Sequence, residues 1–197
     1  MPSVVVPFRG AEGKSRLRVS SSALRATLVR AMLADVVEVC LAVGPTFVVT
    51  PEPIDVPGAT TVEDPRRGQG GAVRAGLDAA VAARGASPFL VVNADLPAIR
   101  PRDLFALAGS VPAGGLALAA ARDGTTNALA FAAAELFEPV YGPGSAGRFA
   151  ALAPSRPVDS PNLVDDIDTI ADLERVGPRL GPRTRRVLGA VRTEAAA

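Results

Sequence analysis

The segment that decides the fold reads Phe89-Leu90-Val91-Val92-Asn93-Ala94-Asp95-Leu96-Pro97. Its first four residues are apolar, as in a strand that is buried on both faces. A strand of this kind delivers Asp95 at its carboxyl end, where a carboxylate can bind a metal ion. A helix cap is the alternative, but Pro97 and Pro101 come before the next helical segment and favour the metal site.

Short apolar runs alternate with longer amphipathic segments on both sides of this strand. We expect strands over residues 3–8, 47–50, 88–93, 116–120 and 128–131, and helices over 22–39, 72–84, 101–108, 145–152 and 169–176. The alternation predicts an α/β fold, a single-domain three-layer sandwich with a mostly parallel, Rossmann-like sheet and right-handed crossovers. Ligands of such folds bind at the carboxyl ends of the strands, so the loops that follow strands are the candidate site.

The overall composition limits the number of domains and excludes some classes of function. The chain has 197 residues, which suits one domain; we assign it residues 1–178 and expect a solvated, Arg- and Pro-rich tail with a short last helix over 179–197. Lys and Arg number 21 against 20 Asp and Glu, so we expect no nucleic-acid or membrane partner. Histidine is absent, which excludes histidine-activated nucleophiles.

Neither a leader nor a membrane anchor is indicated. Pro, Gly, Arg or Asp interrupts every apolar stretch before the ~20 residues that a bilayer requires, and the N-terminal run lacks the basic start of a signal peptide. The single cysteine, Cys40, lies in an apolar run and is interpreted as a core residue. These features predict a cytoplasmic protein.

The first polar loop follows the run Val4-Val5-Val6-Pro7-Phe8 and contains glycines and three cations, Arg9, Lys14 and Arg16. Glycines let backbone N–H groups approach phosphate oxygens, and the cations neutralise their charge, so the loop is typical of a polyphosphate site. A solvated turn is the alternative. Gly13-Lys14-Ser15 is similar to the end of a Walker A loop, but Phe8 stands where that motif needs its first glycine.

A glycine-rich loop leads into the second predicted helix and reads Arg66-Arg67-Gly68-Gln69-Gly70-Gly71. Such a loop at a helix N-terminus can host an anion or let a flat base approach the backbone. A flexible connector is the alternative. The dense glycines and flanking arginines favour nucleotide contact through Gln69, Gly70 and Gly71.

Three carboxylates occur together in Val164-Asp165-Asp166-Ile167-Asp168-Thr169. If residues 163–168 are extended, Asp166 and Asp168 project to one face and Asp165 to the other, because side chains alternate along a strand. Asp166 and Asp168 can then complete the metal site begun by Asp95. For Asp168, a plain turn before a helix is the alternative, since Thr169 and Asp172 match a capping box.

A second small-anion cradle is indicated by Thr125-Thr126-Asn127 and by Tyr141-Gly142-Pro143-Gly144-Ser145. Hydroxyls, an amide and a Gly-Pro-Gly-Ser turn at a helix start suit an anion. Each half taken singly is also an ordinary turn signal.

Taken in order, five motifs resemble one family. They are Lys14-Ser15-Arg16-Leu17, Ala94-Asp95-Leu96-Pro97, Thr126-Asn127-Ala128-Leu129, Gly142-Pro143-Gly144-Ser145 and Asp166-Ile167-Asp168-Thr169. The family is the 2-phospholactate or phosphoenolpyruvate guanylyltransferases of coenzyme F-420 biosynthesis, relatives of the molybdenum-cofactor guanylyltransferases. The resemblance covers nearly the whole chain. It implies a sheet of the nucleotide-diphospho-sugar transferase type and transfer of GMP from GTP to phosphoenolpyruvate or 2-phospho-L-lactate, with release of pyrophosphate.

The resemblance also implies residue roles. Asp95, Asp166 and Asp168 would be the Mg²⁺ ligands. Lys14 would contact the triphosphate or the substrate phosphate, and with Asp95 forms the predicted catalytic pair. The polar loops described above and the resemblance together predict substrate binding by Arg9, Lys14, Arg16, Gln69, Gly70, Gly71, Thr126, Asn127, Gly142 and Ser145. By the resemblance, Thr126, Gly142 and Ser145 would hold the phosphorylated acid. An acceptor phosphate is already ionised at neutral pH, so no general base is required.

Other interpretations stay open at this point. A nucleotidyltransferase of the same fold could act on molybdopterin or a sugar phosphate, which need a larger acceptor site. A non-catalytic GTP-binding module gives no reason for three carboxylates at strand ends. The sequence distinguishes neither guanine from other bases, nor phosphoenolpyruvate from 2-phospholactate, nor a monomer from a homodimer.

Overall fold

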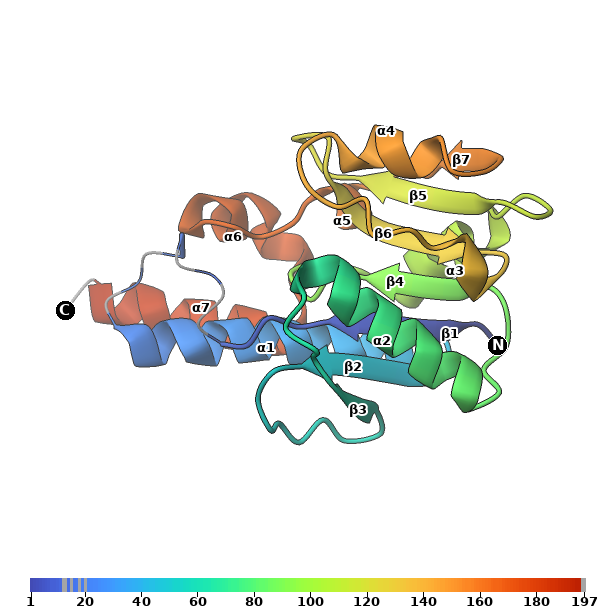
Figure 1. Ribbon diagram of the computed structural model, residues 1–197. Coiled ribbons are helices and arrows are strands. Elements are labelled where there is room, and N and C mark those ends of the chain that lie inside the picture. Colours follow the sequence, from blue (N-terminus) through green and yellow to red (C-terminus); the bar gives the residue numbers. More distant parts are fainter. Residues whose placement is uncertain (12–13, 15, 18, 20, 196–197) are drawn as a thin grey trace.

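The computed structural model describes residues 1–11, 14, 16, 17, 19 and 21–195 (Figure 1). Glu12, Gly13 and Ser15 of the predicted polyphosphate loop lie outside these residues. Within the described part, seven strands form one sheet in the order β3-β2-β1-β4-β6-β5-β7. The strands are β1 (Ser3–Pro7), β2 (Thr46–Thr50), β3 (Thr60–Glu63), β4 (Phe89–Val92), β5 (Leu116–Ala120), β6 (Thr126–Phe131) and β7 (Ser155–Pro157).

The sheet is mostly parallel, as predicted. β1 pairs in parallel with β2 and β4, and β2 pairs in parallel with β3. β6 runs antiparallel to β4 and β5, whereas β5 and β7 are parallel. The shared direction of β1 and β4 brings their carboxyl ends to one edge, where the loops that carry Arg9 and Asp95 begin.

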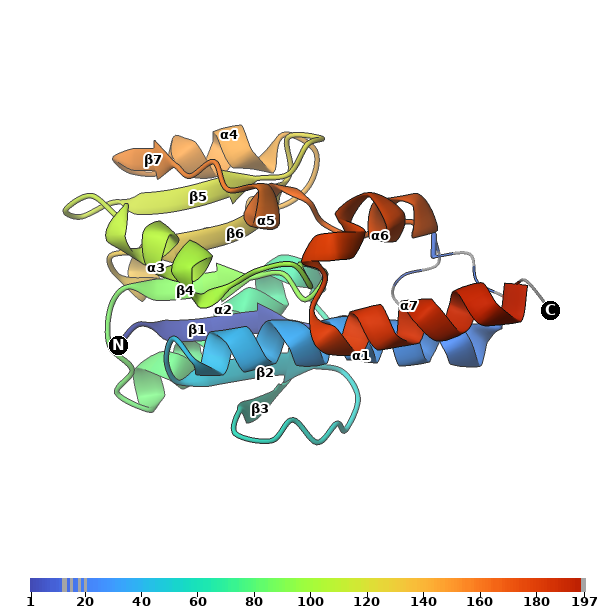
Figure 2. The ribbon, with the colours of Figure 1, turned by 180° about the vertical axis from the view of Figure 1, so that it is seen from behind.

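Helices cover both faces of the sheet, which confirms the three-layer sandwich. α2 (Gly68–Ala82) and α4 (Ser145–Ala150) lie on the face seen in Figure 1. α1 (Ser22–Leu41) and α3 (Pro101–Gly109) lie on the opposite face, with α7 (Pro182–Ala195) beside α1 (Figure 2). The remaining elements are α5 (Pro161–Val164), α6 (Ile170–Val176) and the 3-10 turns η1 (Ala134–Leu136) and η2 (Gly177–Arg179). No helix in the described part is long and apolar enough to cross a membrane.

The two faces of the sheet have separate apolar cores. Val4 packs into the core on the α1 side and Val5 into the core on the α2 side, because side chains alternate along β1. Cys40 lies in the α1-side core, as predicted, and burial raises the pKa of its thiol. Gly76 lets α2 approach the sheet, since a Cβ at this position would lie 2.3 Å from Val5 Cγ1.

Some boundaries differ from the sequence prediction. The edge strands β3 and β7 are missing from it because both are short and largely exposed, so neither produces an apolar run. α2 begins at Gly68 instead of residue 72, which makes the glycine-rich segment the first helical turn and not a loop. Close packing explains the glycine at position 70, where a Cβ would lie 2.5 Å from Pro139 Cβ.

The C-terminal segment contains the last helix that the sequence predicts. α7 begins beside Asp35 of α1, whose carboxylate accepts hydrogen bonds from the backbone N–H groups of Arg183 and Thr184 and from the Thr184 hydroxyl. Asp35 and Thr184 are buried, and Leu188 joins the α1-side core. The last helix that the sequence predicts is therefore present, and it packs against α1 because a distant carboxylate caps it and apolar contacts hold it.

Candidate active site

A cavity of about 840 Å³ opens at the carboxyl ends of the central strands. Its wall combines the loop after β1, the start of α2, the end of β4, the β5–β6 turn, the turn before α4 and the segment before α6. Gly70 and Gly71 do not line it, since they face Pro139 and Arg67 in the first turn of α2. The other predicted site residues do line it: Arg9, Lys14, Arg16, Gln69, Asp95, Thr126, Asn127, Gly142, Ser145, Asp166 and Asp168.

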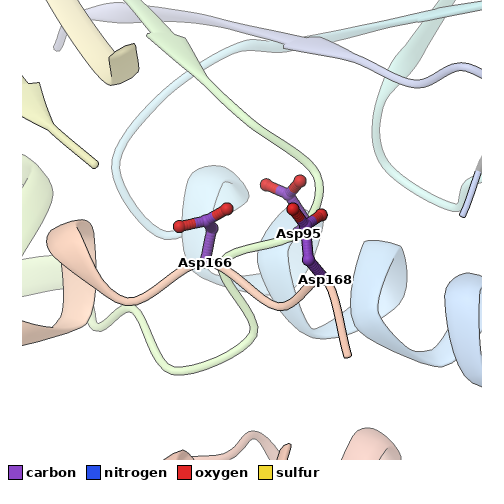
Figure 3. A group of neighbouring side chains, drawn as sticks. All are labelled: Asp95, Asp166 and Asp168. Carbon is purple, nitrogen blue, oxygen red and sulfur yellow. The ribbon is translucent and has the colours of Figure 1, made fainter. Parts of the chain in front are cut away.

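Three carboxylates converge in this cavity (Figure 3). Asp95 follows β4, whereas Asp166 and Asp168 come from the segment between α5 and α6, and one oxygen of each lies within 4.8 Å of the others. The backbone joins the two segments, because the Ile167 N–H donates to the Asp95 carbonyl at 3.0 Å. Ile167 itself is fully buried in the core, which leaves its two neighbours facing the cavity.

Asp165 does not line the cavity, whereas Asp166 and Asp168 do, as the sequence predicts. The extended segment that the prediction assumes is shorter than expected, because residues 163 and 164 belong to the short helix α5. It is 2% exposed and pairs with Arg122 at 2.8 Å, with Arg175 at 2.5 Å and with Arg179. Burial acts to raise the pKa of Asp165, but the hydrogen bonds from these arginines outweigh it and hold the pKa at about 2. This ionised carboxylate anchors the segment that carries Asp166 to the β5–β6 turn, α6 and η2.

Lys14 lies between two of the converging carboxylates. Its Nζ is 2.6 Å from Asp95 Oδ2 and 2.5 Å from Asp168 Oδ1. Burial acts to lower the pKa of Lys14, but the carboxylates of Asp95 and Asp168 outweigh it, so the pKa is raised and the amine stays protonated. Arg16 adds a longer ion pair to Asp168, at 3.3 Å. Burial, together with the charge of Asp95, raises the pKa of Asp166.

The donor set suits a hard divalent cation. Carboxylate oxygens are the protein ligands that Mg²⁺ prefers. Asp95 Oδ1 is buried and accepts no hydrogen bond from the residues that the structure describes, which leaves one acceptor that a cation would satisfy. The residues Asp95, Asp166 and Asp168 therefore fit the metal that the sequence analysis expects.

Two hydroxyl groups join the halves of the predicted small-anion cradle. The Thr126 and Ser145 hydroxyls lie 3.0 Å apart, and both side chains are buried. Gly142 adopts a φ of +112°, a conformation that favours glycine, and its carbonyl accepts the Ser145 N–H at 3.0 Å. The start of β6 and the start of α4 thus contribute one hydroxyl each to the same part of the cavity.

Asn127 has a role that the sequence does not reveal. It is 3% exposed, and its amide donates to the Leu163 carbonyl at 3.0 Å, the Val164 carbonyl at 3.1 Å and Asp166 Oδ1 at 3.4 Å. The amide therefore joins β6 to the segment that carries Asp166. These bonds orient the carboxylate cluster, whereas the sequence analysis assigns Asn127 to substrate binding.

Asn93 is a site residue that the sequence analysis does not single out. Its amide nitrogen donates to the Thr126 carbonyl at 3.1 Å, and its amide oxygen accepts from Gln69 at 3.0 Å. Gln69 in turn accepts from Arg9 at 3.2 Å. These hydrogen bonds form a chain along the cavity wall, from the loop after β1 to the start of β6. The place of Asn93 directly after a buried strand is the sequence signal that points to it.

The amino-acid sequence matches the model of a known protein family. Residues 12–152 match the model of the MobA-like NTP transferase domain. This chain belongs to the MobA-like NTP transferases. The family is the broader one that the five sequence motifs imply, and the converging site residues lie where such a sheet is expected to bind its ligands.

Relatives of this MobA-like transferase include guanylyltransferases whose names state the acceptor. A phosphoenolpyruvate guanylyltransferase from Sphaerobacter thermophilus is 40% identical over 125 residues, which is 60% of each chain. One from Streptomyces scabiei is 36% identical over 203 residues, covering 92% of this chain and 93% of the relative. A 3-phospho-D-glycerate guanylyltransferase from Phenylobacterium zucineum is 35% identical over 209 residues, covering 95% of both.

Solved structures confirm the fold of this MobA-like transferase. A structure from Desulfovibrio desulfuricans G20, described as that of a putative nucleotide-diphospho-sugar transferase, superposes with a TM-score of 0.74 at 16% identity, covering 96% of this chain and 94% of the other. At that identity the likeness concerns the fold, and it agrees with the sheet type that the resemblance implies.

Proposed function

We propose that this chain transfers GMP from GTP to the phosphate of a small phosphorylated carboxylic acid and releases pyrophosphate. Phosphoenolpyruvate is the first acceptor to test, since two of the relatives above are named phosphoenolpyruvate guanylyltransferases. 2-Phospholactate and 3-phosphoglycerate are close in size and charge. The observation that carries the proposal is the meeting, in one cavity, of three carboxylates and Lys14 with the Thr126–Ser145 hydroxyl pair.

The reaction needs no proton transfer from a side chain. An oxygen of the acceptor phosphate bonds to the α-phosphorus of GTP, while the bond from that phosphorus to the bridging oxygen breaks and pyrophosphate leaves with the electron pair. The acceptor oxygen is already ionised at neutral pH, so positioning and charge neutralisation account for catalysis. The absence of histidine from the chain is compatible with this chemistry.

Different residues of the cavity would bind the metal ion, the nucleotide and the acceptor. Asp95, Asp166 and Asp168 would hold Mg²⁺, which when bound supplies positive charge beside the phosphates. Lys14 keeps a protonated ammonium at the same place, supported by its ion pairs to Asp95 and Asp168. Arg9 and Gln69 would contact the nucleotide, and the Thr126 and Ser145 hydroxyls would donate to the acceptor.

Pyrophosphate release is the test. The purified chain is incubated with Mg²⁺ and each of the four NTPs, with and without phosphoenolpyruvate, 2-phospholactate or 3-phosphoglycerate, and products are identified by mass spectrometry. We expect release that requires both GTP and one acid, and a product whose mass is the acid plus GMP minus water. Release with no acid dependence, or none with any pair, would contradict the proposal; a silent protein that still binds GTP would indicate a binding module.

A further inference from the structure

One arginine beside the acceptor cradle holds an entire turn. Arg148 of α4 donates from Nε to the Val140 carbonyl at 3.1 Å, from Nη2 to the Tyr141 carbonyl at 3.1 Å and from Nη1 to the Pro143 carbonyl at 2.6 Å. Its backbone N–H also reaches the Gly144 carbonyl at 3.4 Å. The guanidinium thus binds three carbonyl groups of the turn, whereas the backbone bond to Gly144 is the ordinary helical one.

These bonds set the direction of the N–H groups in the turn. In a trans peptide the carbonyl and the N–H of the following residue point in opposite directions. The Tyr141–Gly142 peptide is trans, so a Tyr141 carbonyl aimed at Arg148 turns the Gly142 N–H away from the guanidinium. Gly142 lines the cavity, and within the described residues its N–H has no protein acceptor.

Other contacts hold the two ends of the turn, on either side of the Tyr141–Gly142 peptide. The Tyr141 ring packs against Phe137 and Phe149, which fixes the entry of the turn, and the Ser145 N–H closes on the Gly142 carbonyl at its exit. Gly142 and Gly144 between them have φ values of +112° and +70°. Glycine pairs of this kind have many accessible conformations, so the turn needs an external partner to keep one of them.

We propose that Arg148 is a positioning residue for the acceptor: it holds the turn over residues 140–144 so that the Gly142 N–H joins the Thr126 and Ser145 hydroxyls in binding the phosphorylated acid. The inference rests on the proposed function. Arg148 does not line the cavity itself, so its effect passes through the backbone. Loss of the Arg148 side chain should weaken binding of the acceptor acid and leave binding of GTP unchanged.

The test is a split between two Michaelis constants. Arg148→Gln and Arg148→Lys are compared with Arg156→Gln, which alters an exposed arginine of β7 without a side-chain hydrogen bond in the described part of the chain. For both Arg148 variants we expect the KM for the acid to rise about tenfold to a hundredfold, the range for a lost hydrogen bond to a charged group. The KM for GTP should change less than about twofold, because the substitution does not alter the interactions that bind the nucleotide. Lysine should not restore the acceptor KM, since one ammonium cannot reach three carbonyls together.

The outcomes separate this inference from the proposed function. A wild-type chain that releases no pyrophosphate with GTP and any acid contradicts the proposed function, and with it the acceptor that Arg148 would serve. An active wild type with an unchanged acid KM in both Arg148 variants contradicts the positioning role only. A parallel rise of the KM values for GTP and acid, or full recovery in Arg148→Lys, also contradicts it. If Arg148→Gln does not fold by circular dichroism, Arg148→Lys decides by the same comparison.

Discussion

The ammonium of Lys14 lies 2.6 Å from Asp95 Oδ2, so the loop after β1 and the end of β4 meet through one ion pair. The same ammonium lies 2.5 Å from Asp168, which comes from the segment before α6. The Lys14 ammonium therefore offsets the repulsion between two carboxylates that come from distant parts of the chain. Removing the cation and removing a carboxylate should have different consequences.

Asp95→Asn should lower turnover at least about a hundredfold while the fold stays intact, because one ligand charge beside the transferred phosphorus is lost. Pyrophosphate release at saturating GTP and acid measures the effect. Asp159→Asn serves as the matched control, since Asp159 is exposed and has no ion pair in the described part of the chain. Near-normal turnover of Asp95→Asn would contradict the metal assignment.

Lys14→Met should destabilise the metal-free protein, because Asp95 and Asp168 lose the ammonium between them and only the longer, exposed Arg16–Asp168 pair remains. The partly exposed pairs suggest a loss of about 1–2 kcal/mol, below the value for a fully buried pair. For a chain of this size that corresponds to a melting temperature about 2–8 °C lower.

Added Mg²⁺ distinguishes this explanation of Lys14 from a simple packing effect. If the carboxylates bind the ion, Mg²⁺ should raise the melting temperature of Lys14→Met more than that of the wild type, since binding to the folded state alone stabilises it. Thermal unfolding with EDTA and with Mg²⁺ measures both shifts. An equal or smaller Mg²⁺ shift in the variant would argue against a cation among these carboxylates.

Asn127→Ala tests the orienting role of the buried amide. Loss of the amide leaves the Leu163 and Val164 carbonyls without this donor, so unfolding should become easier by about 1–3 kcal/mol. The Mg²⁺ concentration for half-maximal activity should rise, because Asp166 is less well held. An unchanged Mg²⁺ requirement with a raised KM for the acid would instead support the substrate contact that the sequence suggests.

Gly76→Ala probes the contact between α2 and the sheet. The added Cβ would meet Val5 Cγ1 at 2.3 Å and Val49 Cγ2 at 2.8 Å, so overpacking should cost about 1–3 kcal/mol in urea unfolding. Gly147→Ala in α4 is the control, since a Cβ there meets nothing within 4 Å and a helical alanine should stabilise by about 0.5–1 kcal/mol. Equal midpoints for both variants would rule out close packing as the reason for Gly76.

Much of the fold follows from local patterns in the chain. The apolar run before Asp95 predicts β4, and the order of strands and helices predicts a mostly parallel sheet. Thr169 and Asp172 form the expected capping box, since both partners lie within one helical turn. Edge strand β7 escapes the prediction because three residues with little burial leave no periodic signal.

Some features of the site can likewise be expected from the sequence, and others depend on the tertiary structure. Residue chemistry and the resemblance to the guanylyltransferases are enough to expect Asp95, Asp166 and Asp168 together. Asp95 lies at a strand end as expected, whereas Asp166 and Asp168 follow the short helix α5 instead of a strand. Only the folded chain decides that Lys14 lies between two of them, that Asn127 donates to the segment carrying Asp166, and that Asp35 caps α7. These contacts join residues far apart in the chain, and their existence depends on how crossovers and helices pack, which no local propensity specifies.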